Sequence, residues 1–340
     1  MEKNSRLGYR EEGIMKKIRI GQIGMSHEHA SAKMMTLRQL TDYYEVVGIV
    51  DDLNYNAPKY PGMDMECYAG IRRMSEEELF NVKGLQAVAV ETANTELVPT
   101  AIRCMKRGLH MHLDKPGGEI MEPFTELIEG CKRKNLAIQL GYMYRVNPAI
   151  KFCFKAVREG WLGEIFEIHA IMNRFDDENY RKYLSNFKGG AMFNFGCHLI
   201  DLVISIMGRP ENVVSFQKST ADDGLNDNGL AVLEYSRATA TVNSAITEVD
   251  GFKYRRFIVC GTKGTVEICP LEHSADLYRI EPLYARLTLL EDNSEYSAGT
   301  HKVNVGVMNG RYENQLIELA HIINGEISNP YTYEHELLVQ

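Results

Sequence analysis

The chain has 340 residues, and its 38 lysines and arginines against 46 aspartates and glutamates give a formal net charge of −8. This acidic balance argues against a general nucleic-acid binder, because such proteins need an excess of positive charge to neutralise phosphates. No run approaches the roughly 20 apolar residues of a membrane helix and the charged N-terminus does not read as a signal peptide, so we expect a cytoplasmic protein that binds neither nucleic acid nor membrane.

Residues 15–141 alternate short β-rich runs with longer helical segments, whereas residues 1–14 stand outside this pattern. The alternation predicts a doubly wound α/β domain, in which parallel strands are joined by right-handed crossovers. We expect residues 1–14 to be either a disordered extension or the result of a start placed too early. The strands are predicted at 18–23, 45–50, 86–90, 109–113 and 136–140, and the helices at 28–40, 75–80, 95–107 and 122–134.

Residues 142–340 are different, because most of their strands follow one another without the helices that a parallel sheet requires. This half predicts a second α/β domain with a large, mostly antiparallel open sheet. Its first helix is expected to begin after Asn147, a good N-cap, with Pro148 at the first helical position. The helices are predicted at 149–159, 197–207, 312–323 and 334–340, and the strands at 163–172, 212–218, 229–234, 239–248, 254–259 and 264–268.

The first predicted strand leads into a glycine turn that immediately precedes a helix. A dinucleotide-binding fold needs glycine there, so that the backbone can approach a pyrophosphate at the helix N-terminus. The match is partial, because Ser26 and His29 stand where the second and third fingerprint glycines would follow Gly24. The residues expected to contact the cofactor here are Gly21, Gly24, Met25, Ser26 and His27.

Asp51 follows the second predicted strand, where dinucleotide folds carry an acidic residue. Its carboxylate would accept hydrogen bonds from a ribose and repel a 2′-phosphate, which favours NAD over NADP. The alternative is that Asp51 and Asp52 only begin a polar turn.

Two later segments present polar side chains where a ligand could bind. Lys115 follows the strand at 109–113, and ligands of open α/β sheets bind at the carboxyl ends of strands. His198 lies three residues before Asp201 at the start of a predicted helix, and a histidine can take a proton from an alcohol as hydride leaves. Spacing alone leaves the alternatives open that Lys115 is a solvated surface charge and that His198 is structural.

A metal site is not predicted. The pairs His27/His29 and His110/His112 have a spacing that two metal ligands on a strand can share. No Asp or Cys cluster completes a coordination shell by spacing, and the seven cysteines contain no C-x-x-C pair. His27 and His29 are instead expected to flank the cofactor phosphates.

In this order, the motifs resemble those of the Gfo/Idh/MocA family of glucose–fructose oxidoreductase, inositol dehydrogenase and rhizopine catabolism proteins. The resemblance implies an N-terminal Rossmann domain, a C-terminal α/β domain with an open sheet, and a homodimer or homotetramer. It also implies NAD(P)-dependent hydride transfer at a carbinol of a sugar, polyol or related compound. The motifs are the glycine turn at 21–29, the D-K-P tripeptide at 114–116, the segment 141–148, the G-G…H-x-x-D block at 189–201 and G-T-K-G-T at 261–265.

The resemblance assigns roles to particular residues. Lys115 matches the lysine of the family's E-K-P motif and would orient the reacting hydroxyl, and His198 matches the acid/base histidine. Asn194 stands where many members have an aspartate, so we expect Asp201 to supply the negative charge beside His198, or else a different chemistry. The residues implied to contact the nucleotide are Thr92, Asn94, Asp114 and Lys115, and those implied to contact the substrate are Tyr142, Arg145, Arg174, Asn194 and His198.

Three alternatives remain open. The segment at 173–183, which mixes charges and aromatics, either grips a polyhydroxylated ligand or is a solvated loop. The family also includes regulators that bind a dinucleotide without turnover, and Asn194 and the irregular glycine turn are compatible with that function. The third alternative is a glycosidase that uses tightly bound NAD to oxidise its sugar transiently, followed by elimination.

Overall fold

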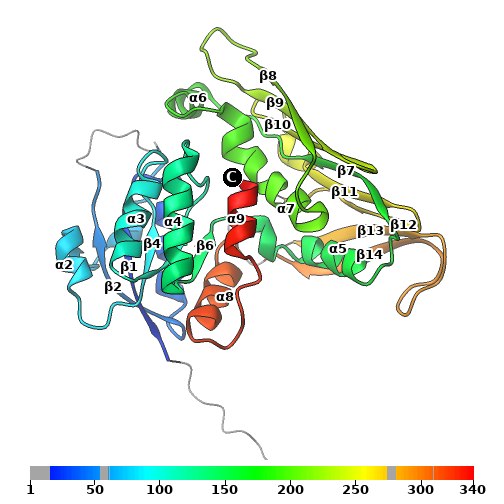
Figure 1. The fold of residues 1–340 in the computed structure, drawn as a ribbon. Coiled ribbons are helices and arrows are strands. Elements are labelled where there is room, and N and C mark those ends of the chain that lie inside the picture. Colours follow the sequence, from blue (N-terminus) through cyan, green and yellow to red (C-terminus); the bar gives the residue numbers. More distant parts are fainter. Residues whose placement is uncertain (1–15, 54–59, 61, 274–280, 309) are drawn as a thin grey trace, which may run out of the picture.

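The computed structural model describes residues 16–53, 60, 62–273, 281–308 and 310–340 (Figure 1). The segment at 1–14, for which a disordered extension was one expectation, lies outside the described residues. Two sheets organise the chain, a six-stranded parallel sheet at one end and an eight-stranded sheet at the other (Figure 1).

The first sheet has the strand order β3-β2-β1-β4-β5-β6, which is that of a Rossmann fold. Every strand lies close to its predicted position, except that the two-residue β3 was not predicted. The strands are β1 Ile18–Ile23, β2 Tyr44–Val50, β3 Arg73–Met74, β4 Ala87–Val90, β5 His110–Leu113 and β6 Ile138–Leu140, and the helices are α1 Ala30–Gln39, α2 Glu76–Phe80, α3 Leu97–Lys106 and α4 Met121–Lys134.

Strand β4 explains how this sheet is covered. Its four residues are fully buried and alternate between the two faces of the sheet. Val88 and Val90 join the large core that includes α3 and α4, whereas Ala87 and Ala89 pack in a separate cluster with Leu316. Leu316 belongs to α8 (Glu313–Ile323), so a helix from the far end of the sequence covers one face of the Rossmann sheet (Figure 1).

The second sheet has the order β14-β13-β12-β11-β7-β10-β9-β8. It is antiparallel except for the pair β7 and β10, which confirms the prediction of a mostly antiparallel sheet. Strands β13 and β14 were missed, although Leu283, Ala285 and Leu287 give β13 a regular alternation of buried and exposed positions. The strands are β7 Ile165–Ile171, β8 Asn212–Lys218, β9 Asn228–Tyr235, β10 Ala238–Ala245, β11 Arg256–Gly261, β12 Gly264–Ile268, β13 Pro282–Leu289 and β14 Gly299–Val307.

The remaining helices are α5 Pro148–Arg158, α6 Glu178–Leu184, α7 Cys197–Met207 and α9 Tyr333–Val339. Asn147 caps α5 as predicted, because its side chain accepts hydrogen bonds from Ala149 N and Ile150 N. Part of the segment at 173–183 is helical rather than a loop, since the Asp177 side chain caps α6 by accepting from Tyr180 N.

Helix α9 is fastened to the interior by a buried ion-pair network. The Arg145 guanidinium donates to Glu336 on α9 at 2.7 and 2.9 Å and to Asp201 on α7 at 2.6 Å. All three side chains are buried, so each carboxylate depends on the guanidinium for compensation. The Gln340 side chain, just after the helix, also donates to Gly118 O at 2.6 Å.

We expect Glu336→Gln to lower the free energy of unfolding by about 3 kcal/mol, because it removes one partner of a buried ion pair. Urea unfolding followed by circular dichroism measures this loss. The matched control is Glu334→Gln on the same helix, which breaks an exposed pair with Lys132 and should leave stability little changed. Equal effects of the two substitutions would contradict the role given to the buried network.

Candidate functional site

The glycine turn after β1 is packed against the loop that follows β4. Gly24 has φ +99°, and a Cβ added to it would lie 2.4 Å from Thr92 N, so the position requires glycine. Asp52 organises the turn, since its carboxylate accepts hydrogen bonds from Met25 N at 2.7 Å and from the Ser26 hydroxyl. Of the neighbouring Asp51 and Asp52, only Asp51 was predicted from the sequence to have a role at the cofactor site.

Asp51 lies at the carboxyl end of β2, where the cofactor role predicted for it requires it. Its carboxylate is partly exposed and forms an ion pair with Arg73 on β3. Nearby, Thr92 and Asn94 are buried, and Thr92 Oγ1 and Asn94 Oδ1 find no hydrogen-bond partner among the described residues. A glycine turn, an acidic residue after β2 and two unpartnered polar atoms in the loop after β4 fit a bound dinucleotide.

A cluster of buried charges lies beneath the turn. Asp114, at the end of β5, contacts His29 Nδ1 at 2.9 Å and lies 3.9 Å from His27 Nδ1. His27, His29 and Asp114 offer atoms close enough together to hold a metal ion. The sequence spacing did not reveal this group, because Asp114 comes from a strand distant in the sequence. The Lys33 ammonium lies 3.7 Å from Asp114 Oδ2 and already supplies positive charge beside this carboxylate. Burial lowers the pKa of His27 to about 4, so its ring is neutral near pH 7.

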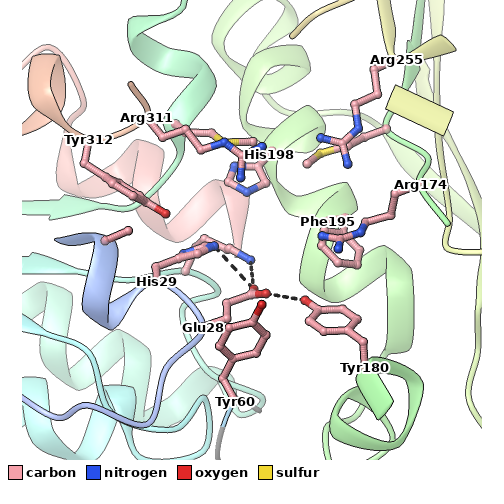
Figure 2. Close-up of a pocket in the computed structure, with 14 residues that line it drawn as sticks. Glu28, His29, Tyr60, Arg174, Tyr180, Phe195, His198, Arg255, Arg311 and Tyr312 are labelled. Carbon is pink, nitrogen blue, oxygen red and sulfur yellow. Dashed lines mark hydrogen bonds and ion pairs between the residues drawn. The ribbon is translucent and has the colours of Figure 1, made fainter. Parts of the chain in front are cut away.

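Lys115 is not a surface lysine, because its side chain is only 1% exposed. Its ammonium donates to Asn194 O at 2.9 Å and to a Glu28 carboxylate oxygen at 3.1 Å. Burial alone would raise the pKa of Glu28, but Lys115, His29, His27 and the Tyr180 hydrogen bond together hold that pKa well below its usual range. Glu28 also accepts a hydrogen bond from the Tyr180 hydroxyl (Figure 2).

His198 is buried between two aromatic rings, with its ring centroid 5.9 Å from that of Tyr142 and 5.7 Å from that of Tyr144. Its Nδ1 atom has no hydrogen-bond partner among the described residues. Burial, and then the positive charge of Lys115, lower the pKa of His198 well below its ordinary value. The ring is therefore neutral near pH 7 and able to accept a proton.

The expectation that Asp201 supplies charge to His198 is corrected by the structure. Asp201 lies on the same helix, but its carboxylate is occupied by Arg145 and by His335 Nε2 at 2.9 Å. Arg145 was implied to contact the substrate, but its guanidinium is paired with Asp201 and Glu336 instead. Sequence spacing could not show this, because the competing partners are 56 and 134 residues distant.

Asn194 lies in a single turn of π-helix, Met192–Gly196, directly before α7. The Asn194 carbonyl rather than its side chain makes the 2.9 Å contact with Lys115, while its Nδ2 lies 3.5 Å from the Tyr180 hydroxyl. Wide turns of this kind are frequent at functional sites. Here the turn places the Asn194 carbonyl within hydrogen-bond distance of the Lys115 ammonium.

These side chains border a cavity of about 190 Å³ between the two sheets (Figure 2). Of the predicted substrate residues, Arg174 and His198 line it together with Lys115, whereas Tyr142, Arg145 and Asn194 are not among its described lining residues. Sequence reasoning missed other lining residues because they come from distant parts of the chain. They are Glu28, Tyr60, Arg255, Arg311 and Tyr312, whereas Tyr180 belongs to the segment 173–183 that was considered for ligand binding.

Comparison with known proteins identifies the family. Residues 153–267 match the model of the GFO/IDH/MocA C-terminal domain. The chain is 28% identical over 195 residues to the uncharacterized oxidoreductase YhhX of Escherichia coli (strain K12), a match covering 56% of this chain and 54% of the relative. These matches support a Gfo/Idh/MocA family oxidoreductase.

A second relative of the chain is the 2,7-anhydro-N-acetylneuraminate hydratase of the same organism. It is 24% identical over 226 residues, covering 63% of this chain and 59% of the relative. The matches thus span between half and two thirds of these curated relatives. The crystal structure of levoglucosan dehydrogenase with NADH and levoglucosan has a TM-score of 0.75 and 16% identity, covering 95% of this chain and 94% of that one. This likeness shows the fold. In the described part of this chain, no helix is long and apolar enough to cross a membrane.

We expect this protein to lose stability as the pH falls from 6.5 towards 4. Unfolded His27 takes up a proton near pH 6.5, whereas folded His27 takes it up only near pH 4, so acid favours the unfolded chain. The difference corresponds to about 3 kcal/mol for this one residue. Urea unfolding at several pH values measures it.

In this pH series, His27→Gln should flatten the slope of the unfolding free energy. The control is His301→Gln on β14, which lies in the other sheet and should leave the slope as it is. An unchanged slope in His27→Gln would show that the buried ring does not govern acid sensitivity.

Proposed function

We propose that this protein is an NAD-dependent oxidoreductase that transfers a hydride between nicotinamide and a carbinol of a sugar or polyol. The observation that carries the proposal is the convergence of Lys115 and His198, from opposite halves of the chain, on one cavity beside the glycine turn. Ligands of open α/β sheets bind at this edge, outside the carboxyl ends of the strands. The levoglucosan dehydrogenase that shares the fold is named for a sugar substrate and was solved with NADH, which supports the proposal.

The residues of the chain have separate tasks in this reaction. A bound nicotinamide would supply the acceptor or donor of the hydride. A Glu28 carboxylate oxygen and the Asn194 carbonyl accept two N–H groups of Lys115. The third N–H has only a long contact of 3.5 Å with Asn194 Oδ1, so it can donate to the reacting oxygen and stabilise negative charge on it. Neutral His198 accepts the proton of the hydroxyl as the carbinol is oxidised. Glu28 acts as a positioning residue, because it fixes the lysine from the side of the glycine turn.

The cofactor preference rests on Asp51. Its carboxylate would accept the ribose hydroxyls of NAD and repel the 2′-phosphate of NADP. Arg73 partly neutralises that carboxylate, and an arginine at this place is also what a 2′-phosphate would contact. Asp51 therefore favours NAD and Arg73 favours NADP. We assign the larger contribution to Asp51 because it directly follows β2.

We also propose that the protein is a homodimer or homotetramer that associates through the eight-stranded sheet. Val214 and Phe216 on the edge strand β8 are 43% and 53% exposed, and, being two residues apart on one strand, they share a face of the sheet. Neighbouring exposed apolar side chains on a sheet are typical of an interaction surface. Sedimentation of the purified protein would report the assembly.

For the cofactor, we expect NADH to bind at least about tenfold more tightly than NADPH, a difference of roughly 1.4 kcal/mol. Asp51→Asn should narrow this ratio, because it removes the charge that repels the 2′-phosphate. Quenching and enhancement of nucleotide fluorescence during titration measure both affinities. Asp42→Asn, an exposed aspartate before β2, is the control. Equal binding of the two nucleotides by the natural chain would overturn the NAD assignment, and binding of neither would overturn the oxidoreductase proposal.

For catalysis, Lys115→Met should reduce turnover about 100-fold or more, because the variant keeps the side-chain length but loses the donor to the reacting oxygen. The assay is NADH formation from NAD with a panel of sugars and inositols. Lys151→Met on α5, an exposed position, serves as the control. Full activity of Lys115→Met would rule out this mechanism, and NADH binding without turnover of any substrate would favour the alternative of a regulator.

A further inference from the structure

Three arginines face the cavity from different parts of the chain (Figure 2). Arg174 follows β7, Arg255 precedes β11, and Arg311 precedes α8. Hydride transfer at a neutral sugar needs none of them, since Lys115 and His198 already serve the reacting hydroxyl. Their presence at the wall opposite the glycine turn requires its own explanation.

The charges of this wall do not balance. One carboxylate, that of Glu272, is shared by two guanidinium groups, since Arg255 is ion-paired with it and Arg311 Nη2 donates to it at 2.7 Å. Arg174 and Lys115 have one carboxylate partner each. Among the described residues, four cations thus line the cavity and three carboxylates compensate them. The cations are Lys115, Arg174, Arg255 and Arg311, and the carboxylates are Glu28, Asp176 and Glu272.

Arg255 has an unused donor group. Its side chain is 1% exposed, its Nε donates to Asn173 O at 2.9 Å, and its Nη1 contacts Glu272. Its Nη2 finds no hydrogen-bond partner among the described residues, and neither does Arg174 Nε. An unpartnered buried guanidinium nitrogen is costly unless a ligand satisfies it. The ring of Phe252, 3.7 Å below the Arg255 guanidinium, holds its plane in place.

We propose that this wall binds a carboxylate of the substrate, so that the protein acts on an acidic monosaccharide such as a uronic acid. The inference rests on the proposed function and narrows its substrate class. A carboxylate is planar and accepts parallel N–H donors from a guanidinium, and this contact is about twice as strong as one between neutral groups. It would supply the negative charge that the wall lacks.

The size of the cavity limits the substrate to a single sugar ring. Its volume is about 190 Å³, below the roughly 300–1,000 Å³ of pockets that hold drug-sized ligands. The arginine wall would bind the carboxylate of the ring, while Lys115 and His198 would contact the carbinol to be oxidised.

The test compares matched acidic and neutral sugars. D-glucuronate and D-galacturonate are titrated against D-glucose and D-galactose, with the protein saturated in NADH, by calorimetry and by the shift in melting temperature. We expect each uronate to bind at least about tenfold more tightly than its neutral parent. Glucose 6-phosphate is included, because a phosphate would also be attracted by the arginines. Equal binding of acid and neutral sugar overturns the inference, and tighter binding of the phosphate overturns the choice of a carboxylate.

Variants assign the effect to the wall. Arg255→Gln should reduce the preference for the uronate about tenfold or more while NADH affinity stays unchanged. Arg256→Gln, the exposed neighbour on β11, should alter neither. If Arg255→Gln does not fold, Arg311→Gln gives the same comparison from the other side of Glu272. A loss of binding that is equal for uronate and neutral sugar would make Arg255 merely structural and would contradict the inference.

The same measurements separate this inference from the proposed function. NADH binding without a preference for uronates overturns the acidic substrate and leaves the oxidoreductase proposal intact. Without NADH binding, the oxidoreductase proposal falls. The shift in melting temperature with uronate alone then decides whether an anion site exists, since it needs neither cofactor nor turnover.

Discussion

The buried ammonium of Lys115 is the interaction on which the site depends. It stands at the end of β5 in the first sheet, yet its partners are Glu28 beside the glycine turn and the Asn194 carbonyl before α7. A charge that is 1% exposed is stable only if its hydrogen bonds are made, so these partners and the lysine hold one another in position. The nucleotide-binding turn, the strand that carries the lysine and the helix that carries His198 are thereby brought to one place.

Buried charges elsewhere follow the same rule, and they are arranged as separate networks. Arg145 binds α7 and α9 together through Asp201 and Glu336, while Glu272 gathers Arg255, Arg311 and the Tyr144 hydroxyl. The first network has one guanidinium for two carboxylates, so it has no positive charge left for an anionic ligand. The second leaves positive charge in excess at the cavity wall. An arginine is available to a ligand when the carboxylates around it do not balance its charge, and it is structural when they do.

The fold class of both halves and most elements could be predicted from the sequence, because hydrophobic period and glycine position are local signals. The placement of Lys115 at a strand end also followed from the pattern, since carboxyl ends of parallel strands meet at one edge. The partners of buried side chains could not be predicted. His198 and Asp201 share a helix face, but only the packing of the turn at 143–146 against α7 shows that Asp201 is paired with Arg145. The arginine wall joins residues more than fifty positions apart, which no local spacing reveals.

Helix α8 has a consequence for how the molecule can be divided. It follows the eight-stranded sheet in the chain, but it covers the Rossmann sheet, with Leu316 and Ala320 packed in one cluster with Ile18 and Ala87. A fragment cut after residue 141 would lack this cover and expose one apolar face of its central strands to water. The cofactor half of this protein is therefore not an exchangeable module. Grafting it onto another substrate half would require that half to bring a replacement for α8.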